Sequence, residues 1–371
     1  MNDNVRIAKT MVCQKLLNLS NANVAMAFVD RASASFNTNI FMLCVLVIGM
    51  LTNSAFLFTL IRVTRMKTIP NFYFALQSIM DIIFLNVVIT PIVHTKLSGF
   101  HVGHIPTSSL GCWLYYFVIA GSYTFSFSLI FFVSFDRFYA ISDPLRHKVY
   151  ASTGRLVKFT AIGLVFSTIC AVLLCLNRSR YVRTCLMWPD EEQFSSYPHY
   201  RHDCIPPNKT TGILKWILKT VPFLIVTVCI SGFYIKILSV LNDKSISKST
   251  APARQASVRN QVARIVICNG IIFFISFAPS TIVETIRFIA PQMANVTSMY
   301  IGEMFIFFNS GVNTLSFPIL SPFYRQAYRE AFCLCCNACS QSNDEEGGGD
   351  TRMENMESNT GHVDSRPPNT V

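Results

Sequence analysis

The sequence is poor in charged residues, and this shortage argues against most classes of soluble protein. Only 14% of its 371 residues are charged, whereas a soluble domain carries about 25%. Hydrophobic residues make up 51% of the chain, and the mean hydropathy is +0.40. This composition indicates a membrane protein.

Acidic residues are scarcer than basic ones. Asp and Glu number 20 against 31 Lys and Arg, which gives a net charge of +11. In a soluble protein such an excess could indicate a nucleic-acid partner. Here the basic residues mostly flank apolar runs, as they do on the cytoplasmic side of membrane proteins, so we expect no nucleic-acid partner.

Several features of other protein classes are missing. The beginning, "MNDNVRIAKTMVCQKLLNLS", lacks the charged-then-apolar pattern of a signal peptide, so the first spanning helix is expected to act as the targeting signal. We find neither the internal symmetry of a transporter nor a catalytic cluster such as His-x-x-x-His or paired carboxylates at one depth. We therefore expect neither a transporter nor an enzyme.

Seven apolar stretches are each long enough to cross a membrane. A helix needs about 20 mostly apolar residues to span ~30 Å of hydrocarbon. The stretches are 40–61, 72–94, 110–135, 156–176, 213–241, 262–289 and 299–320. The predicted fold is therefore an all-α membrane protein with a seven-transmembrane helix bundle.

Polar segments flank the bundle on both sides. Residues 337–371 contain "NDEEGGGDTRMENMESNTGH" and lack apolar content, so this tail is expected to be disordered. The predicted divisions are an N-terminal segment 1–38, the seven-helix domain 39–320, an amphipathic helix 321–336 and the tail.

Basic residues and glycosylation sequons indicate the orientation. The loops after the first, third and fifth stretches, and the segment after the seventh, carry Lys and Arg and are expected to be cytoplasmic. The N-terminus is then outside. The sequons at Asn18, Asn208 and Asn295 fall on the predicted outside and are the expected glycosylation sites. A further match at Asn177 abuts a span and is discounted.

An ordered set of motifs lies on these stretches. "DRF" closes the third stretch and is followed by "DPL", "GMLTNS" and "ALQSIMD" lie on the first two, "FFISFAP" lies on the sixth and "NSGVNTLSF" on the seventh. Next comes "SPFYRQAYREAFCLCC", which looks like a short amphipathic helix along the membrane. Over residues 40–339 the chain resembles a rhodopsin-like (class A) G-protein-coupled receptor.

The resemblance implies how the charged motif works. Asp136 would pair with Arg137 at the membrane edge, and on activation Arg137 would be released to face a heterotrimeric G protein. Phe138 stands where relatives carry Tyr. Arrestin and receptor kinases would be further cytoplasmic partners. The alternative is a pair of surface charges that extend to the membrane edge.

The resemblance also implies a set of activation switches, in which the sixth helix hinges near its proline. These are Phe273, Phe277, Pro279, Asn313 and Phe317.

Three residues depart from the family pattern in this region. Phe277 replaces a Trp, Thr314 a Pro and Phe317 a Tyr. Losing tyrosine hydroxyls removes polar contacts that would stabilise the active state. A scavenger of the same fold that binds without signalling is therefore an alternative.

Asp81 lies deep in an apolar stretch, where a carboxyl group needs a partner or a proton. The resemblance implies that Asp81 belongs to a cluster of polar side chains whose oxygen atoms bind an allosteric sodium ion. This cluster would comprise Asp81, Ser126, Asn309 and Asn313, with Asn53 and Ser310 beside them. The alternative is a protonated Asp81 with hydrogen bonds and no ion. No other cofactor is expected.

Two residues disfavour well-known ligand classes of the family. Ile119 stands where amine receptors carry an Asp, and Phe307 stands where opsins carry the retinal lysine. Counting from the motifs places other side chains in an outward-opening cavity. The candidates for ligand binding are Glu303, Glu284, Tyr123, Tyr116, Ile119 and Arg287, with His94, Lys215, Lys219 and Tyr300.

Glu303 is the expected anchor for a cationic ligand group. Glu284 and Arg287 are spaced i, i+3, so these two residues could instead pair with each other. The stretch "RMKTIPNFYFALQSIMD" resembles peptide-hormone receptors. A neuropeptide or peptide hormone is therefore the expected ligand, and a small chemosensory molecule is the alternative.

The resemblance also implies a disulfide bond at Cys112. Cys112 matches the family's disulfide cysteine and could pair with Cys185 or Cys204. Cys204 is favoured because its separation from Pro222 is the more usual one in the family. Cys185 would then be free or paired with Cys13.

The run "CLCCNAC" has too little of the paired spacing of a zinc site. Palmitoylation, which would anchor the segment in membrane lipid, is expected at Cys333, Cys335 and Cys336.

Overall fold

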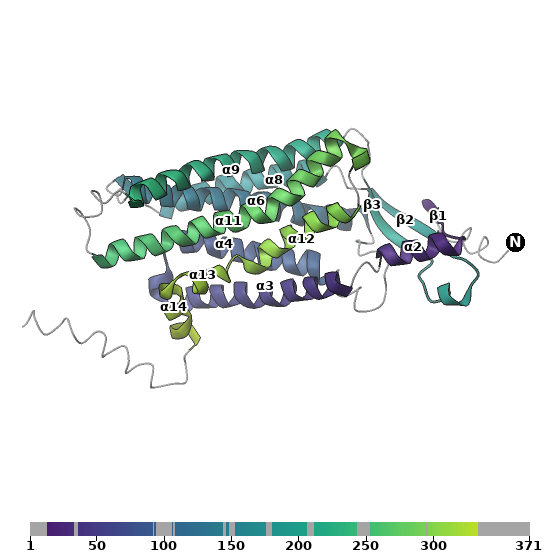
Figure 1. Ribbon diagram of the computed structural model, residues 1–371, viewed down its shortest axis with the longest axis horizontal. Coiled ribbons are helices and arrows are strands. Elements are labelled where there is room, and N and C mark those ends of the chain that lie inside the picture. The colour runs from purple at the N-terminus through teal and green to yellow at the C-terminus, as the bar shows by residue number, and fades with distance from the viewer. Residues whose placement is uncertain are drawn as a thin grey trace, which may run out of the picture.

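The computed structural model shows a bundle of long helices with a small β-sheet at one end (Figure 1). We call this end the sheet end, and the opposite end, where α14 (Pro322–Phe332) lies, the α14 end. The structure describes residues 13–32, 36–91, 93, 106, 108–143, 146–147, 153–175, 180–205, 211–242, 253–293 and 296–332.

Seven helices build the bundle. They are α3 (Phe36–Arg62), α4 (Ile69–Phe84), α6 (Ser109–Ser142), α8 (Thr153–Cys175), α9 (Thr211–Asn242), α11 (Ala253–Ile289) and α12 (Val296–Val312). By length and composition, 6 helices in the described residues can cross a membrane, and α12 contains a shorter apolar stretch, Ile301–Val312. The arrangement is the predicted seven-helix bundle.

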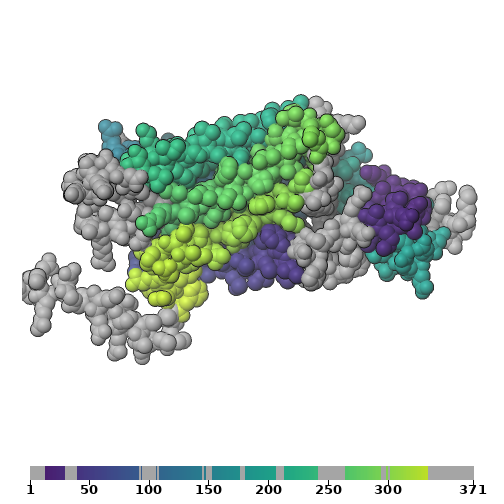
Figure 2. Space-filling view, viewed as in Figure 1, coloured from purple at the N-terminus to yellow at the C-terminus, as the bar shows by residue number. Residues whose placement is uncertain are grey.

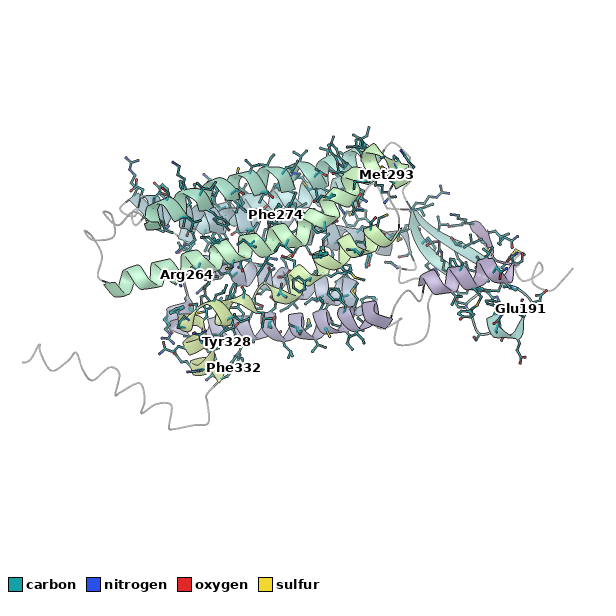
Figure 3. The ribbon with its side chains drawn as sticks, in the orientation of Figure 1. Glu191, Arg264, Phe274, Met293, Tyr328 and Phe332 are labelled. Atoms are coloured by element: carbon teal, nitrogen blue, oxygen red, sulfur yellow. A yellow bond between two sulfur atoms is a disulfide. The ribbon has the colours of Figure 1, made fainter. Side chains whose placement is uncertain are left out.

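The outer helices turn apolar side chains away from the protein. Val228 and Ile235 of α9 are 71% and 68% exposed, which suits a hydrocarbon surrounding rather than water. Helix α6 occupies the centre and packs against α4, α8, α9 and α11. Figure 3 shows one outward-facing side chain, Phe274 of α11.

Two spans depart from regular α-helix. α4 continues into a π-helical turn, η2 (Leu85–Ile89), and the Thr90 hydroxyl donates to the Leu85 carbonyl at 3.2 Å. The stretch 299–320, expected as one helix, instead breaks between α12 and α13 (Ser316–Leu320). Ser316 Oγ donates to the Asn313 carbonyl at 2.7 Å, which gives this backbone acceptor a partner at the break.

A small β-sheet covers the sheet end and was not predicted. The middle strand β2 (Arg180–Met187) pairs in parallel with β1 (Lys15–Asn18) and antiparallel with β3 (Tyr200–Ile205). Helix α2 (Ala22–Ala32) follows β1. We call residues 15–32 and 180–205, which contain β1, α2, β2 and β3, the sheet module. The N-terminal segment, expected only as a polar head, thus contributes a strand and a helix beside the β2–β3 segment (Figure 2).

The sheet module has a hydrophobic core of its own. Its buried residues are Leu19, Ala25, Val29, Leu186, Trp188 and Phe194. The Trp188 ring lies 5.8 Å from that of Phe194 and donates its N–H to the Pro198 carbonyl at 2.9 Å. The module is therefore packed together from the N-terminal segment and the loop after α8.

Short helical turns connect the other elements. They are η1 (Thr64–Met66), η3 (Glu192–Phe194) and η4 (Pro291–Met293). Helix α14 buries Tyr324 and Ala327 and leaves Phe332 more than half exposed, as an amphipathic helix at a membrane surface does. Figure 3 labels Phe332 and Tyr328 on this helix.

Candidate functional site

A cavity of about 280 Å³ opens among the helices at the sheet end. It reaches inward as far as Asp81, so the predicted ligand residues and the predicted polar cluster share one continuous space. Its lining includes Tyr116, Ile119, Tyr123, Lys215, Lys219, Glu284, Arg287, Met299, Glu303, Phe307 and Asp81. The side chains of His94 and Tyr300 lie outside the described residues.

Charged side chains join α9 to α11 across this cavity. Glu284 Oε1 lies 2.6 Å from Lys215 Nζ and 3.7 Å from Lys219 Nζ. Lys219 Nζ also lies 5.6 Å from the centre of the Tyr123 ring. The i, i+3 pairing of Glu284 with Arg287 is thus replaced by pairing with two lysines, and Glu284 is partly neutralised from within the protein.

Two further charged residues of the cavity, Arg287 and Glu303, lie on α11 and α12. Arg287 lies near the end of α11 that faces the sheet end, with its Nη1 3.8 Å from Met299 Sδ. Glu303 lines the cavity from α12. The cavity therefore presents both signs of charge to a ligand.

An aromatic cluster lies beneath the cavity. The rings of Tyr123 and Phe277 are 5.0 Å apart, and Phe127 lies 5.1 Å from both Phe273 and Phe277. Pro279 lies inside α11, close to Phe277. Because a proline removes one helical hydrogen bond, α11 has a weak point beside the floor of the cavity.

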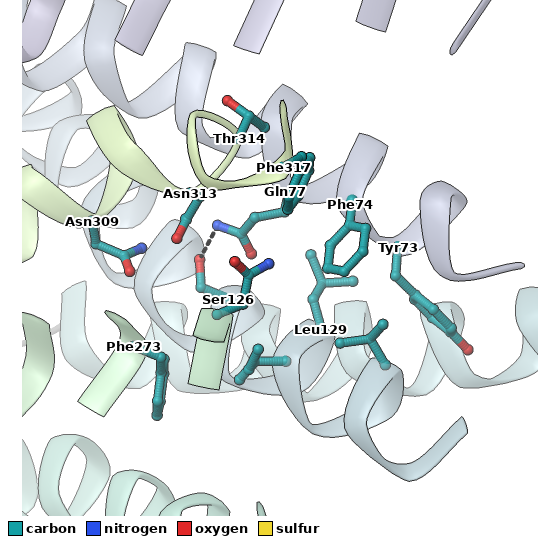
Figure 4. Close-up of a pocket in the computed structure, with 13 residues that line it drawn as sticks. Tyr73, Phe74, Gln77, Ser126, Leu129, Phe273, Asn309, Asn313, Thr314 and Phe317 are labelled. Carbon is teal, nitrogen blue, oxygen red and sulfur yellow. Dashed lines mark hydrogen bonds between the residues drawn. The ribbon is translucent and has the colours of Figure 1, made fainter. Parts of the chain in front are cut away.

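Asp81 is 2% exposed and is held by amide groups. Gln77 Nε2 donates to Asp81 Oδ1 at 3.2 Å and to Ser126 Oγ at 2.9 Å. Asn313 Nδ2 donates to Asp81 Oδ2 at 3.1 Å. Asn309 lines the same region (Figure 4). Gln77 was not predicted from the sequence, although it lies one helical turn before Asp81.

Asn53 is one step removed from this cluster. It donates to the carbonyl groups of Gly49 at 2.8 Å and Ser310 at 3.0 Å, and it accepts from the Thr314 hydroxyl at 3.3 Å. Its hydrogen bonds thus link α3 to α12 at the break. Thr314, at the place of the family's proline, contributes one of them.

At the α14 end, Asp136 is 4% exposed and contacts three basic side chains. Arg137 Nη2 lies 2.5 Å from Asp136 Oδ2. Arg155 Nη2, from α8, lies 2.9 Å from Oδ1, and His147 Nε2 lies 3.2 Å from the same oxygen. The Asp136–Arg137 pair was predicted from the sequence, whereas Arg155, which the packing of α8 on α6 brings there, and His147, which lies in the segment after α6, were not.

Tyr234 connects three helices at the α14 end. Its hydroxyl lies 3.0 Å from Ser134 Oγ of α6 and donates to the Val266 carbonyl of α11 at 2.7 Å. The ring lies where a side chain at Gly270 would otherwise be, since an added Cβ would overlap it. The Tyr234 hydroxyl of α9 therefore bonds to both α6 and α11.

The other predicted switch and coupling residues are aromatic. Phe317 is 1% exposed, and its ring lies 5.1 Å from Phe56 and 4.7 Å from Phe74. Phe138 stacks on Phe233 of α9 at 5.1 Å. Both side chains contribute packing only, because neither ring carries a hydroxyl.

Two disulfides fix the sheet end. Cys112, at the beginning of α6, is bonded to Cys204 of β3, and Cys185 of β2 is bonded to Cys13. Asn18 is exposed in β1. The other predicted glycosylation and palmitoylation residues, Asn208, Asn295, Cys333, Cys335 and Cys336, lie outside the described residues.

The β2–β3 pair contains a histidine with a shifted pKa. Tyr181 Oη lies 2.6 Å from His202 Nδ1. Burial and then the Arg183 guanidinium lower the pKa of His202 from 6.5, and the nearby Asp203 opposes this change. The neutral imidazole is therefore favoured in the folded sheet module.

Comparison with known proteins places this architecture in a family. The family described as "7 transmembrane receptor (rhodopsin family)" matches residues 52–317, which is more than half of the chain. Its members are receptors rather than enzymes, and the multiple apolar helices are those of a multi-pass plasma-membrane protein.

Individual relatives are receptors for peptides by name. The chain is similar to the Tachykinin-like peptides receptor 86C of Drosophila melanogaster, at 25% identity over 73% of the chain and 53% of the relative. It is also similar to the Somatostatin receptor type 5 of Rattus norvegicus, at 23% identity over 79% of the chain and 76% of the relative.

A third relative is the Neuropeptide CCHamide-1 receptor of Drosophila melanogaster, at 26% identity over 83% of the chain and 62% of the relative. The chain thus spans about half to two thirds of the length of the two Drosophila receptors. Since the family match extends from residue 52 in α3 to residue 317 in α13 and covers the six bundle helices from α4 to α12 completely, the chain belongs to the rhodopsin family of seven-transmembrane receptors.

Proposed function

We propose that this protein is a G-protein-coupled receptor whose extracellular ligand is a peptide. The observation that carries the proposal is the cavity at the sheet end, which runs from a charged rim to Asp81. A ligand that fills it would contact α9, α11 and α12 at once. It could therefore shift the position of α11, provided that it binds one arrangement of these helices more tightly than another.

The charges of the cavity suit a peptide. Arg287 and Glu303 lie on neighbouring helices and carry opposite charges, and Lys219 lies deeper, beside Tyr123. A peptide offers carboxylate and cationic groups on one flexible chain, so it can satisfy both signs. The names of the relatives, which are receptors for tachykinin-like peptides, somatostatin and CCHamide, support the same ligand class.

In this proposal the sheet end faces the outside and the α14 end faces the cytoplasm. The two disulfides at the sheet end support this orientation, because disulfides form in oxidising compartments. At the α14 end, Arg137 would leave Asp136 to contact the G protein. The many partners of Asp136 would then hold the carboxylate in place when Arg137 departs.

The test is G-protein activation in cells that express the chain, challenged with a library of short peptides and, in parallel, with small metabolites. We expect a peptide response that Arg137→Ala abolishes. Glu303→Gln should raise the half-maximal concentration about 10- to 100-fold, the effect of one lost hydrogen bond to a charged group. Glu191→Gln, at the exposed loop tip labelled in Figure 3, is the matched control and should change nothing.

Two results would contradict the proposal. Activation by metabolites alone would favour the small-molecule receptor. Surface expression with measurable peptide binding but no activation would favour the non-signalling scavenger, for which Thr314 and Phe317 are the sequence arguments.

A further inference from the structure

The Gln77 side chain lies between the two groups that a sodium ion would bridge. Its amide nitrogen is 3.2 Å from Asp81 Oδ1 and 2.9 Å from Ser126 Oγ. Figure 4 shows the contact with Ser126, with Asn309 and Asn313 on the opposite side. One uncharged N–H₂ group thus reaches both oxygens.

The direction of these hydrogen bonds follows from the partners. Ser126 has a single hydroxyl proton, and it donates this proton to the Ser122 carbonyl at 2.9 Å. Ser126 Oγ must therefore accept from Gln77, which places the nitrogen of the amide, and not its oxygen, on this side. The same orientation directs the second N–H at Asp81 Oδ1.

This arrangement does not fit a sodium ion. An ion that bridged Asp81 Oδ1 and Ser126 Oγ would have to lie between these two oxygens, and the Gln77 amide nitrogen already occupies that position. The other carboxylate oxygen, Asp81 Oδ2, accepts from Asn313 at 3.1 Å. Each of the two Asp81 oxygens thus already has an amide donor, and a cation would have to displace the Gln77 group from both of its acceptors.

Displacing Gln77 is costly because of its surroundings. The side chain lines a cavity of about 30 Å³, whose other walls include Phe74, Leu129 and Phe273. An amide group that turned away from Asp81 and Ser126 toward these apolar side chains would lose both of its hydrogen bonds.

We propose that the Gln77 amide takes the place of the sodium ion, so that Asp81 is held by the protein's own donors and the receptor is insensitive to sodium. The inference does not depend on the ligand or on G-protein coupling. It concerns only what occupies the space between Asp81 and Ser126.

The test measures the melting temperature of the purified receptor in detergent, in sodium chloride and in choline chloride of equal ionic strength. The wild type should melt at the same temperature in both salts. Gln77→Ala should gain a sodium-dependent rise of roughly 2 °C or more, because the ion then stabilises the folded state by mass action. Adding Asp81→Asn to Gln77→Ala should remove this rise.

Asn86→Ala is the matched control, since it deletes an exposed amide on the same span. It should behave as the wild type. Gln77→Leu serves as a second variant if Gln77→Ala does not fold. A sodium-dependent rise in the wild type that Asp81→Asn abolishes would overturn the proposal, and so would the absence of any rise in both folded Gln77 variants.

Discussion

Replacing Tyr234 by Phe should raise the basal activity of the receptor. The substitution keeps the ring against Gly270 but deletes the hydroxyl, and with it the contacts to Ser134 at 3.0 Å and to the Val266 carbonyl at 2.7 Å. Neutral hydrogen bonds contribute about 0.5–1.5 kcal/mol each in proteins and average about 0.6 kcal/mol between membrane helices. The loss is therefore about 1–2 kcal/mol.

This loss converts into a change of populations. If α11 moves away from α6 on activation, both contacts belong to the resting arrangement only, and the ratio of active to resting receptor rises about 5- to 30-fold. The assay is ligand-free G-protein activation, normalised to surface expression, together with the melting temperature in detergent. Tyr328→Phe on α14 is the control, because this tyrosine lies outside the contact between α6, α9 and α11.

An unchanged basal activity together with an unchanged melting temperature would mean that the hydroxyl contributes nothing to the resting state. A lower melting temperature without increased activity would mean that the contacts persist when the receptor is active.

Three further predictions concern other contacts. Arg155→Gln should lower the melting temperature because Asp136 loses a charge-assisted hydrogen bond worth about 1.5–3 kcal/mol, whereas Arg146→Gln, whose side chain is 75% exposed, should not. Lowering the pH through about 6.5 should destabilise the sheet module, because His202 takes up a proton more readily in the unfolded state than in the folded state, where its pKa is lowered. The measurement is hydrogen exchange of the sheet module as a function of pH. Exchange that is independent of pH after correction for intrinsic rates, or equally pH-dependent in His202→Gln, would contradict this. Cys13→Ser should accelerate hydrogen exchange across Lys15–Asn18, because the Cys13–Cys185 disulfide holds this strand on β2. Cys44→Ser, at a free and exposed cysteine, is the control and should leave the exchange unchanged. Equal exchange rates in both variants would show that β1 stays paired without the disulfide.

The sequence alone determined the bundle and the family resemblance. Each span can be recognised from a run of about 20 apolar residues. This is a local property that does not depend on which helices pack beside it. The "DRF" motif also predicted the Asp136–Arg137 contact, because adjacent residues at a helix end remain close in any fold. The break in the seventh span was not foreseen, since the hydrogen bonds of Asn313 to Asp81 and of Ser316 to Asn269 form only after the helices pack.

Only the tertiary structure decided which side chains meet between helices. These helices are apolar on nearly every side, so their sequences do not state which face turns toward which neighbour or at what depth. The partners of Asp81 and Asp136 on other helices, and the two lysines on Glu284, follow from the rotation and depth at which the helices pack. The sheet module could not be predicted for the same reason. The parallel pairing of β1 with β2 joins segments more than 160 residues apart, and a local sequence pattern does not indicate such a distant partner.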